Sequence, residues 1–199
     1  MNYPDFFNDV EVIKVKDELS AVLGAFSGEY EFNYIDVVKS AGHSCPTVAG
    51  AYLITSEALK ALYPNEVAVR GNIKVEFKEA LEDGVAGVIG NVISQITGAT
   101  DKSGFKGLAG NFARHSLMDF NSDINSSARF TRVDSGESVD VFYDPASIMP
   151  SPNMQALMQK IMSGIAQPLE IKEFGTLWQD RVKRIFENTQ SVIRVVPLA

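Results

Sequence analysis

The chain of 199 residues has room for one domain of ordinary size, and its 45% hydrophobic residues are enough to build a buried core. A formal net charge of −7 argues against nucleic acid and anionic membrane surfaces as partners, because both select clustered lysine and arginine. The largest basic cluster, Arg181 to Arg184, is expected to lie on the solvated face of a helix.

The N-terminal part of the chain predicts helices on both sides of a turn. The apolar residues between positions 8 and 26 are spaced more like a helix than a strand. A short segment, 34–40, then leads into a turn at 41–45. Pro46 suits the first position of a helix, because its missing N–H would be unpaired there in any case. We expect this second helix to continue to Tyr63.

The central part of the chain predicts one helix and several strands. Val75 and Phe77 alternate with charged residues, a pattern typical of a half-buried strand. Residues 83–97 are predicted to form a helix whose three glycines provide a flat, closely packed face. Further strands are predicted at 109–120, 127–133 and 138–143, the last two joined by a hairpin turn.

The C-terminal part begins after a proline-rich break near residue 145. Apolar residues between 154 and 165, many of them methionine, recur at spacings of three and four, which indicates an amphipathic helix. A second helix is predicted at 176–188 and a final strand at 192–196.

These elements predict an α+β fold, in which helices cover a mixed or antiparallel central sheet and further helices follow at the C-terminus. The helical and strand patterns are segregated and show no regular β-α-β alternation. We expect one α+β domain over 1–144, and a C-terminal helical extension over 145–199 that packs on this domain and ends in a strand.

The turn Gly42-His43-Ser44-Cys45-Pro46 combines an imidazole with the single thiol of the chain. In an extended turn, residues two apart project to the same side, so His43 and Cys45 can face one point near the start of the next helix. Free N–H groups and the helix dipole favour a thiolate there. The pair suits zinc, nickel or another late transition metal. It could also act as a nucleophile and its base, or be purely structural.

Three segments of the chain resemble the FmdE family of formylmethanofuran dehydrogenase proteins. They are the turn itself, Ile93-Ser94-Gln95-Ile96-Thr97-Gly98-Ala99-Thr100 and Lys102-Ser103-Gly104. The resemblance implies an α+β fold, commonly dimeric, with a metal ion bound by the turn. It also implies association with molybdenum or tungsten formylmethanofuran dehydrogenase operons. Membership of this family does not by itself define a reaction.

The chain departs from the family pattern at several positions. Ala41 stands where the first histidine of the turn belongs, Thr47 replaces the following glycine, and Ala99 replaces a cysteine of the second segment. His43 and Cys45 are therefore retained, whereas the additional thiols are lost. A zinc site built from four thiolates is excluded, because the chain has one cysteine.

A transition metal requires more than two protein ligands, so at least a third is expected. His115 is the only other histidine and is our candidate, and the carboxylate of Asp36 is a weaker one. With His43, Cys45 and His115 as ligands, the metal would keep an open position for water or a small molecule.

We therefore predict a homodimeric protein that binds zinc or another transition metal such as nickel. One alternative is a thiol-dependent enzyme, in which Cys45 is the nucleophile and His43 its base. Another is a non-catalytic scaffold that binds a partner through the methionine-rich helix. The sequence leaves open whether the protein catalyses a reaction.

The N-terminal sequence and the cysteine content indicate the compartment. A single cysteine cannot form a disulfide within the chain. Residues 1–5 lack the basic region and apolar run of a signal peptide, and the apolar stretch 85–93 is much shorter than a membrane span. We expect a cytoplasmic protein that does not bind membranes or nucleic acid.

Overall fold

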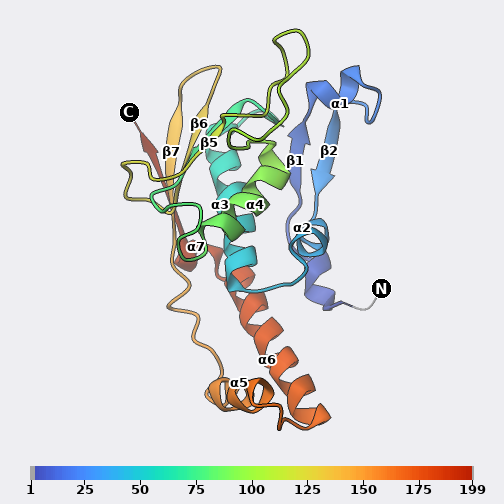
Figure 1. The fold of residues 1–199 in the computed structure, drawn as a ribbon, viewed down its shortest axis with the longest axis vertical. Helices are drawn as coiled ribbons and strands as arrows, with labels where there is room; N and C mark the ends of the chain where they lie inside the picture. Colours follow the sequence, from blue (N-terminus) through green and yellow to red (C-terminus); the bar gives the residue numbers. More distant parts are fainter. Residues whose placement is uncertain (1–2, 199) are drawn as a thin grey trace.

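The computed structural model describes residues 3–198, which form two small β-sheets and the helices that join them (Figure 1). The helical elements are η1 (Asp5–Asn8), α1 (Glu18–Val22), α2 (Tyr34–Ala41), α3 (Pro46–Leu62), α4 (Ala86–Thr97), α5 (Met154–Met162), α6 (Pro168–Glu187) and α7 (Thr189–Val192). The strands are β1 (Ile13–Lys16), β2 (Glu29–Phe32), β3 (Ala68–Val69), β4 (Ile73–Glu76), β5 (Met118–Asp119), β6 (Ala128–Arg132), β7 (Ser138–Tyr143) and β8 (Ile193–Leu198).

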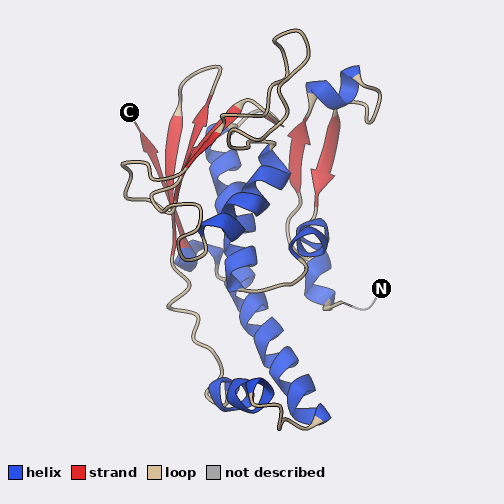
Figure 2. Cartoon of the chain, in the orientation of Figure 1, coloured by secondary structure: helices blue, strands red, loops and turns tan. Residues whose placement is uncertain are grey.

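Both sheets are mixed. In the smaller sheet, with strand order β2-β1-β3, β1 is antiparallel to β2 and parallel to β3. In the larger sheet, with order β5-β4-β6-β7-β8, only the β4–β5 pair is parallel. The two sheets lie on opposite sides of α3 and α4 (Figure 2). The prediction of an α+β fold with a mixed sheet covered by helices is therefore confirmed.

Helix α3 forms the centre of the core. Almost all of its residues are buried, because α4, α6 and the larger sheet pack around it. The close approach of β7 depends on Gly50, since a Cβ at this position would lie 2.2 Å from Cε1 of Tyr143. Gly90 has a similar role in α4, where a Cβ would lie 3.1 Å from Cζ of Phe120. The predicted close packing of the glycine-containing helix is confirmed at this position.

The C-terminal helices extend away from the two sheets. Helix α6 runs from the larger sheet to the far end of the molecule, where α5 crosses it, and we call this pair the helical arm (Figure 1). Methionine and leucine side chains of α5 are buried against the chain, as the spacing of its apolar residues predicts. Several large apolar side chains of the arm are nevertheless exposed, among them Met162, Ile165 and Leu169. None of the described helices is long and apolar enough to span a membrane.

The prediction of a single helix between positions 8 and 26 is wrong. This segment contains β1, in which Ile13 and Val15 are buried and the lysines between and after them are exposed. Asp17 then starts the short helix α1, because its side chain accepts a hydrogen bond from the N–H of Ser20. The apolar spacing was ambiguous because a strand and a helix follow one another without an intervening loop.

The prediction of a strand over 109–120 is also wrong for most of its length. Only Met118–Asp119 pair with the sheet, as β5. Ala109, Phe112 and Ser116 have positive φ angles of 48°, 60° and 57°, which are incompatible with an extended strand. The other predicted helices and strands are present, although α6 begins at Pro168, eight residues before the predicted start.

Candidate functional site

The Gly42–Pro46 turn is formed by the ends of two helices. Gly42 terminates α2 in the left-handed conformation, with φ of 76°, and its N–H donates to the carbonyl of Val38. Cys45 is extended and caps α3, because its Sγ accepts the N–H of Val48 at 3.4 Å. With Pro46 at the first helical position, the turn has the backbone that its sequence predicts.

Hydrogen bonds from α2 and α6 hold the turn in place through Ser44. Its hydroxyl lies 2.9 Å from the phenol oxygen of Tyr34 and donates to Oε1 of Gln179 at 3.0 Å. Its carbonyl accepts from Nε1 of Trp178 at 2.9 Å and from Nε2 of Gln179 at 3.2 Å. Because Ser44 is buried and fully bonded, it fixes the position of the residues on either side.

Two tyrosine phenols surround the thiol. The hydroxyl of Tyr143 donates to the carbonyl of Pro46 at 2.7 Å, and Tyr34 contacts Ser44. Burial raises the pKa of both phenols well above the ordinary value of 10.0. The neighbouring Cys45 contributes to the increase in both pKa values. Both phenols are therefore neutral hydrogen-bond donors in the physiological range.

His43 is exposed and differs from Cys45 in its surroundings. Its Nδ1 lies 3.0 Å from the carbonyl oxygen of Ala41, and a carbonyl can only accept a hydrogen bond. We therefore assign the proton of the neutral imidazole to Nδ1, which leaves the lone pair of Nε2 available. An imidazole held in this way can accept a proton or bind a metal ion.

A cavity of about 420 Å³ lies beside the turn, between the end of α2 and α4, and we call it the His43 cavity. Its lining residues are Ser40, Ala41, His43, Val88, Asn91, Val92, Ser94 and Gln95. The polar side chains among them are hydroxyls, amides and one imidazole. Cys45 does not line this cavity, because its thiol is 9% exposed and faces the start of α3.

The third predicted ligand, His115, lies in the loop before β5. Its Nδ1 is 3.0 Å from the hydroxyl of Ser116, and it is not among the residues that line the His43 cavity. The weaker candidate, Asp36, forms a capping box with Asn33 at the start of α2. A structural role accounts for its carboxylate.

The donor groups of one chain do not fit a resident metal ion. Among residues 3–198, no group of three or more His, Cys, Asp and Glu side chains is arranged to hold one. His43 and Cys45 would contribute two ligands, fewer than the three or four that a protein zinc site requires. We derive no chemical step through a metal for this reason.

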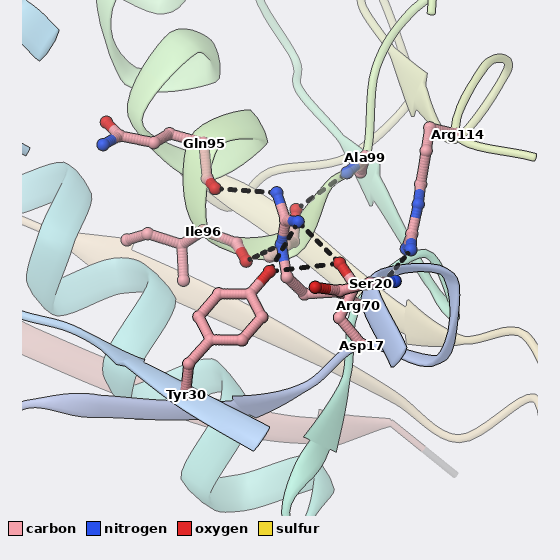
Figure 3. Close-up of polar contacts among 9 residues, drawn as sticks. Asp17, Ser20, Tyr30, Arg70, Gln95, Ile96, Ala99 and Arg114 are labelled. Atoms are coloured by element: carbon pink, nitrogen blue, oxygen red, sulfur yellow. Dashed lines mark hydrogen bonds and ion pairs between the residues drawn. The ribbon is translucent and has the colours of Figure 1, made fainter. Parts of the chain in front are cut away.

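The sequence did not reveal a buried charged cluster around Asp17 (Figure 3). Asp17 is 3% exposed, and its carboxylate oxygens are 2.8 Å from Nη1 of Arg70 and 2.8 Å from Nη2 of Arg114. The phenol of Tyr30 also donates to Asp17, at 3.1 Å. We call these four residues the Asp17 cluster. In the sequence, the only sign of it was an aspartate at a position suited to a helix cap.

The Asp17 cluster fixes the C-terminal end of α4, which is one wall of the His43 cavity. Nε of Arg70 donates to the carbonyl of Ile96 at 2.8 Å, and its Nη2 donates to the carbonyl of Gln95 at 3.0 Å (Figure 3). These carbonyls have no partner within a helix, so Arg70 satisfies them and also favours the negative end of the helix dipole. The smaller sheet thereby positions Gln95, which lines the cavity.

The carboxyl of Asp17 is held in its charged form. Burial raises its pKa, but the N–H of Ser20 and the guanidiniums of Arg70 and Arg114 lower it by more. The resulting pKa lies below the ordinary value of 3.8. Two guanidiniums and one carboxylate give the cluster a formal charge of +1.

Comparisons with known proteins agree with the resemblance in the sequence. The model of a family described as "FmdE, Molybdenum formylmethanofuran dehydrogenase operon" matches residues 41–194. Among solved structures, the chain is similar to an FmdE-like protein, described as belonging to tungsten formylmethanofuran dehydrogenase, from Syntrophus aciditrophicus. The identity is 13%, 84% of this chain and 72% of that chain are covered, and the TM-score is 0.42. A search of curated proteins gives no match. The family match begins at the turn and includes both helices of the arm.

Proposed function

Because the chain belongs to the FmdE family, we propose that it binds a small polar ligand in the His43 cavity, with His43 as the reactive side chain. One observation carries this proposal. The two longer segments that resemble the family meet at this cavity, since the turn contributes His43 and α4 contributes Ser94 and Gln95. A cavity of about 420 Å³ is large enough for a small metabolite.

The chemistry of the cavity follows from its lining. With its proton on Nδ1, His43 presents the lone pair of Nε2, which can accept a proton from a bound ligand. The hydroxyl of Ser94 and the amide of Asn91 can form hydrogen bonds that orient the ligand. The amide of Gln95 is already held, because Nε2 donates to the carbonyl of Asp36 at 3.2 Å. The wall on this side is therefore preorganised.

Binding of zinc or nickel at the turn is a second candidate function. Its support is the hydrogen bond from Nδ1 of His43 to a backbone carbonyl, which is the arrangement that commonly orients a metal-binding imidazole. The thiol of Cys45 is a soft ligand two residues further on. The remaining ligands would have to come from the bound molecule or from a second copy of the chain, which is consistent with the homodimer that we propose.

The geometry favours a structural role for Cys45 over a nucleophilic one. Its thiol is buried, and it accepts the N–H of Val48 as the cap of α3. Within residues 3–198 no hydrogen bond joins it to His43, whose Nδ1 instead contacts Ala41. A role beside formylmethanofuran dehydrogenase is part of the proposal, and its support is the description of the family.

Imidazole NMR signals provide the test, because the chain has two histidines. We would titrate the protein with Zn²⁺ and, separately, with N-methylformamide as a small polar amide, and assign the signals with His43→Ala and His115→Ala. We expect the amide to shift the signals of His43 and to leave those of His115 unchanged. If neither probe moves the signals of His43, the proposal is wrong. A shift of both histidines by Zn²⁺ would identify His115 as a further ligand.

A further inference from the structure

A second cavity, of about 470 Å³, lies on the other side of α3. It is enclosed by the segment that joins η1 to β1, by the middle of α3, and by the end of α6 with α7. We call it the aromatic cavity, and the residues of the turn do not line it. Its volume falls in the range typical of small-molecule sites.

Three aromatic rings form the apolar wall of this cavity. They belong to Phe6, Tyr52 and Phe186, and Leu53 adds an aliphatic surface. The ring centres of Phe6 and Phe186 are 6.4 Å apart, and those of Tyr52 and Phe186 are 6.2 Å apart. The hydroxyl of Tyr52 donates to the carbonyl of Glu11 at 2.8 Å, so this ring is fixed in position. The faces of such rings carry partial negative charge and attract cations.

The charged side chains around the aromatic cavity carry an excess of negative charge. Four carboxylates and two ammonium groups line it, so the formal charge is −2; they belong to Asp9, Glu11, Glu57, Glu187, Lys60 and Lys183.

Both ammonium groups are already paired. Nζ of Lys60 lies 2.6 Å from Glu11 and 2.9 Å from Glu57, and Lys183 lies 3.5 Å from Glu187. Asp9 has no ion pair among the described residues. An anionic ligand would therefore meet uncompensated negative charge, whereas a cationic ligand would reduce it.

We propose that the aromatic cavity binds a small organic cation, an amine with an apolar body. The body of the ligand packs against the rings of Phe6 and Phe186, and its ammonium group faces Asp9 and Glu11. Burial of the apolar part and attraction of the cation to the rings and carboxylates both contribute to binding. The site is independent of the proposed function of the His43 cavity, because the two cavities share no residue.

The experiment compares a cation with a neutral molecule of nearly the same shape. Isothermal titration calorimetry would measure the binding of 2-phenylethylamine, which is protonated at neutral pH, and of 2-phenylethanol. We expect the amine to bind at least about tenfold more tightly than the alcohol, which corresponds to the attraction between a cation and this kind of site.

Variants locate the site. Asp9→Asn combined with Glu11→Gln should weaken binding of the amine by about tenfold or more and leave binding of the alcohol unchanged. Glu29→Gln is the matched control, because Glu29 is an exposed carboxylate on β2 that does not line the cavity. His43→Ala should also leave the affinity for the amine unchanged. Circular dichroism would verify that each variant is folded.

Several results would overturn the proposal. Equal affinities for the amine and the alcohol would show that charge is not selected. Failure of the amine to bind at concentrations of about 10 mM would exclude a site of useful affinity. An unchanged affinity in the Asp9 and Glu11 variant, or an equal loss in Glu29→Gln or His43→Ala, would place the binding outside the aromatic cavity.

Discussion

Arg114 and Asp17 are 97 positions apart in the sequence, and Nη2 of the arginine lies 2.8 Å from Oδ1 of the aspartate. This ion pair joins the loop after α4 to the end of β1. Nη1 of Arg114 has no hydrogen-bond partner within the described part of the chain and lies against Gly71, where a Cβ would be 1.8 Å away. With φ of 79° as well, Gly71 is a position that only glycine fills without strain.

Removal of the carboxylate at Asp17 should destabilise the protein strongly. In Asp17→Asn, the guanidiniums of Arg70 and Arg114 would remain buried without a compensating charge. Loss of one partner of a buried ion pair costs about 3–5 kcal/mol of unfolding free energy. Urea denaturation would measure it. Glu29→Gln, an exposed carboxylate exchange on β2, should change the free energy by less than about 0.5 kcal/mol. A similar small change for Asp17→Asn would contradict our assignment.

The same carboxylate should make stability depend on pH. The pKa of Asp17 in the folded protein lies below the ordinary value of 3.8 that we assume for the unfolded chain. Its contribution to stability is therefore complete above that value and is lost as the pH falls below it toward the folded pKa. Denaturation between about pH 6 and pH 3 should show a smaller decrease in unfolding free energy for Asp17→Asn than for the wild type. Parallel pH profiles would argue against a lowered pKa.

Two glycines in helices should respond to alanine in opposite directions. In Gly50→Ala, the new methyl would collide with the ring of Tyr143, and we expect a loss of about 1–3 kcal/mol of unfolding free energy. In Gly175→Ala, on α6, the methyl meets no atom within 4 Å, and the higher helix propensity of alanine should add about 0.5–1 kcal/mol. Thermal and urea unfolding of both variants test the pair. Stabilisation by Gly50→Ala would show that α3 and β7 can move apart easily.

Exchange of the thiol should separate capping from ligand binding. Serine is a good N-cap, so Cys45→Ser should keep the helix start and change the unfolding free energy by no more than about 1 kcal/mol. If the turn binds zinc, the metal content per chain of protein purified without an affinity tag should fall in Cys45→Ser and in His43→Ala. Elemental analysis after identical dialysis measures this. Equal metal content in the wild type and both variants would exclude the turn as the metal site.

The helical arm should mediate self-association. Leu169 is 80% exposed, and Met162 and Ile165 are also exposed on the arm, a surface that a second chain could cover. We expect sedimentation equilibrium at micromolar concentration to give about twice the chain mass of 21.7 kDa. Leu169→Glu should shift the mass toward that of one chain, whereas Glu29→Gln should not. A mass of one chain for the wild type would contradict the predicted homodimer.

Elements whose sequence carries both a start signal and one clear periodicity could be predicted closely. The helix from Pro46 begins where its proline and the capping residue Cys45 indicate, and the strand 138–143 has the predicted bounds. The turn at Gly42–Pro46 could be singled out because its residue types are unusual and local. These features depend on neighbours within a few positions, and a sequence contains that information directly.

Only the tertiary structure could show which side chains meet. His43 and Cys45 are two residues apart, yet one lines a cavity against α4 and the other caps α3. The partnership of Asp17 with Arg114 depends on the path of the loop before β5, where positive φ angles interrupt the predicted strand. Local patterns determine backbone preferences, whereas contacts over long separations follow from packing of the whole chain. For this reason the sequence identified the turn, and the structure determined the cavities and the ion pairs around it.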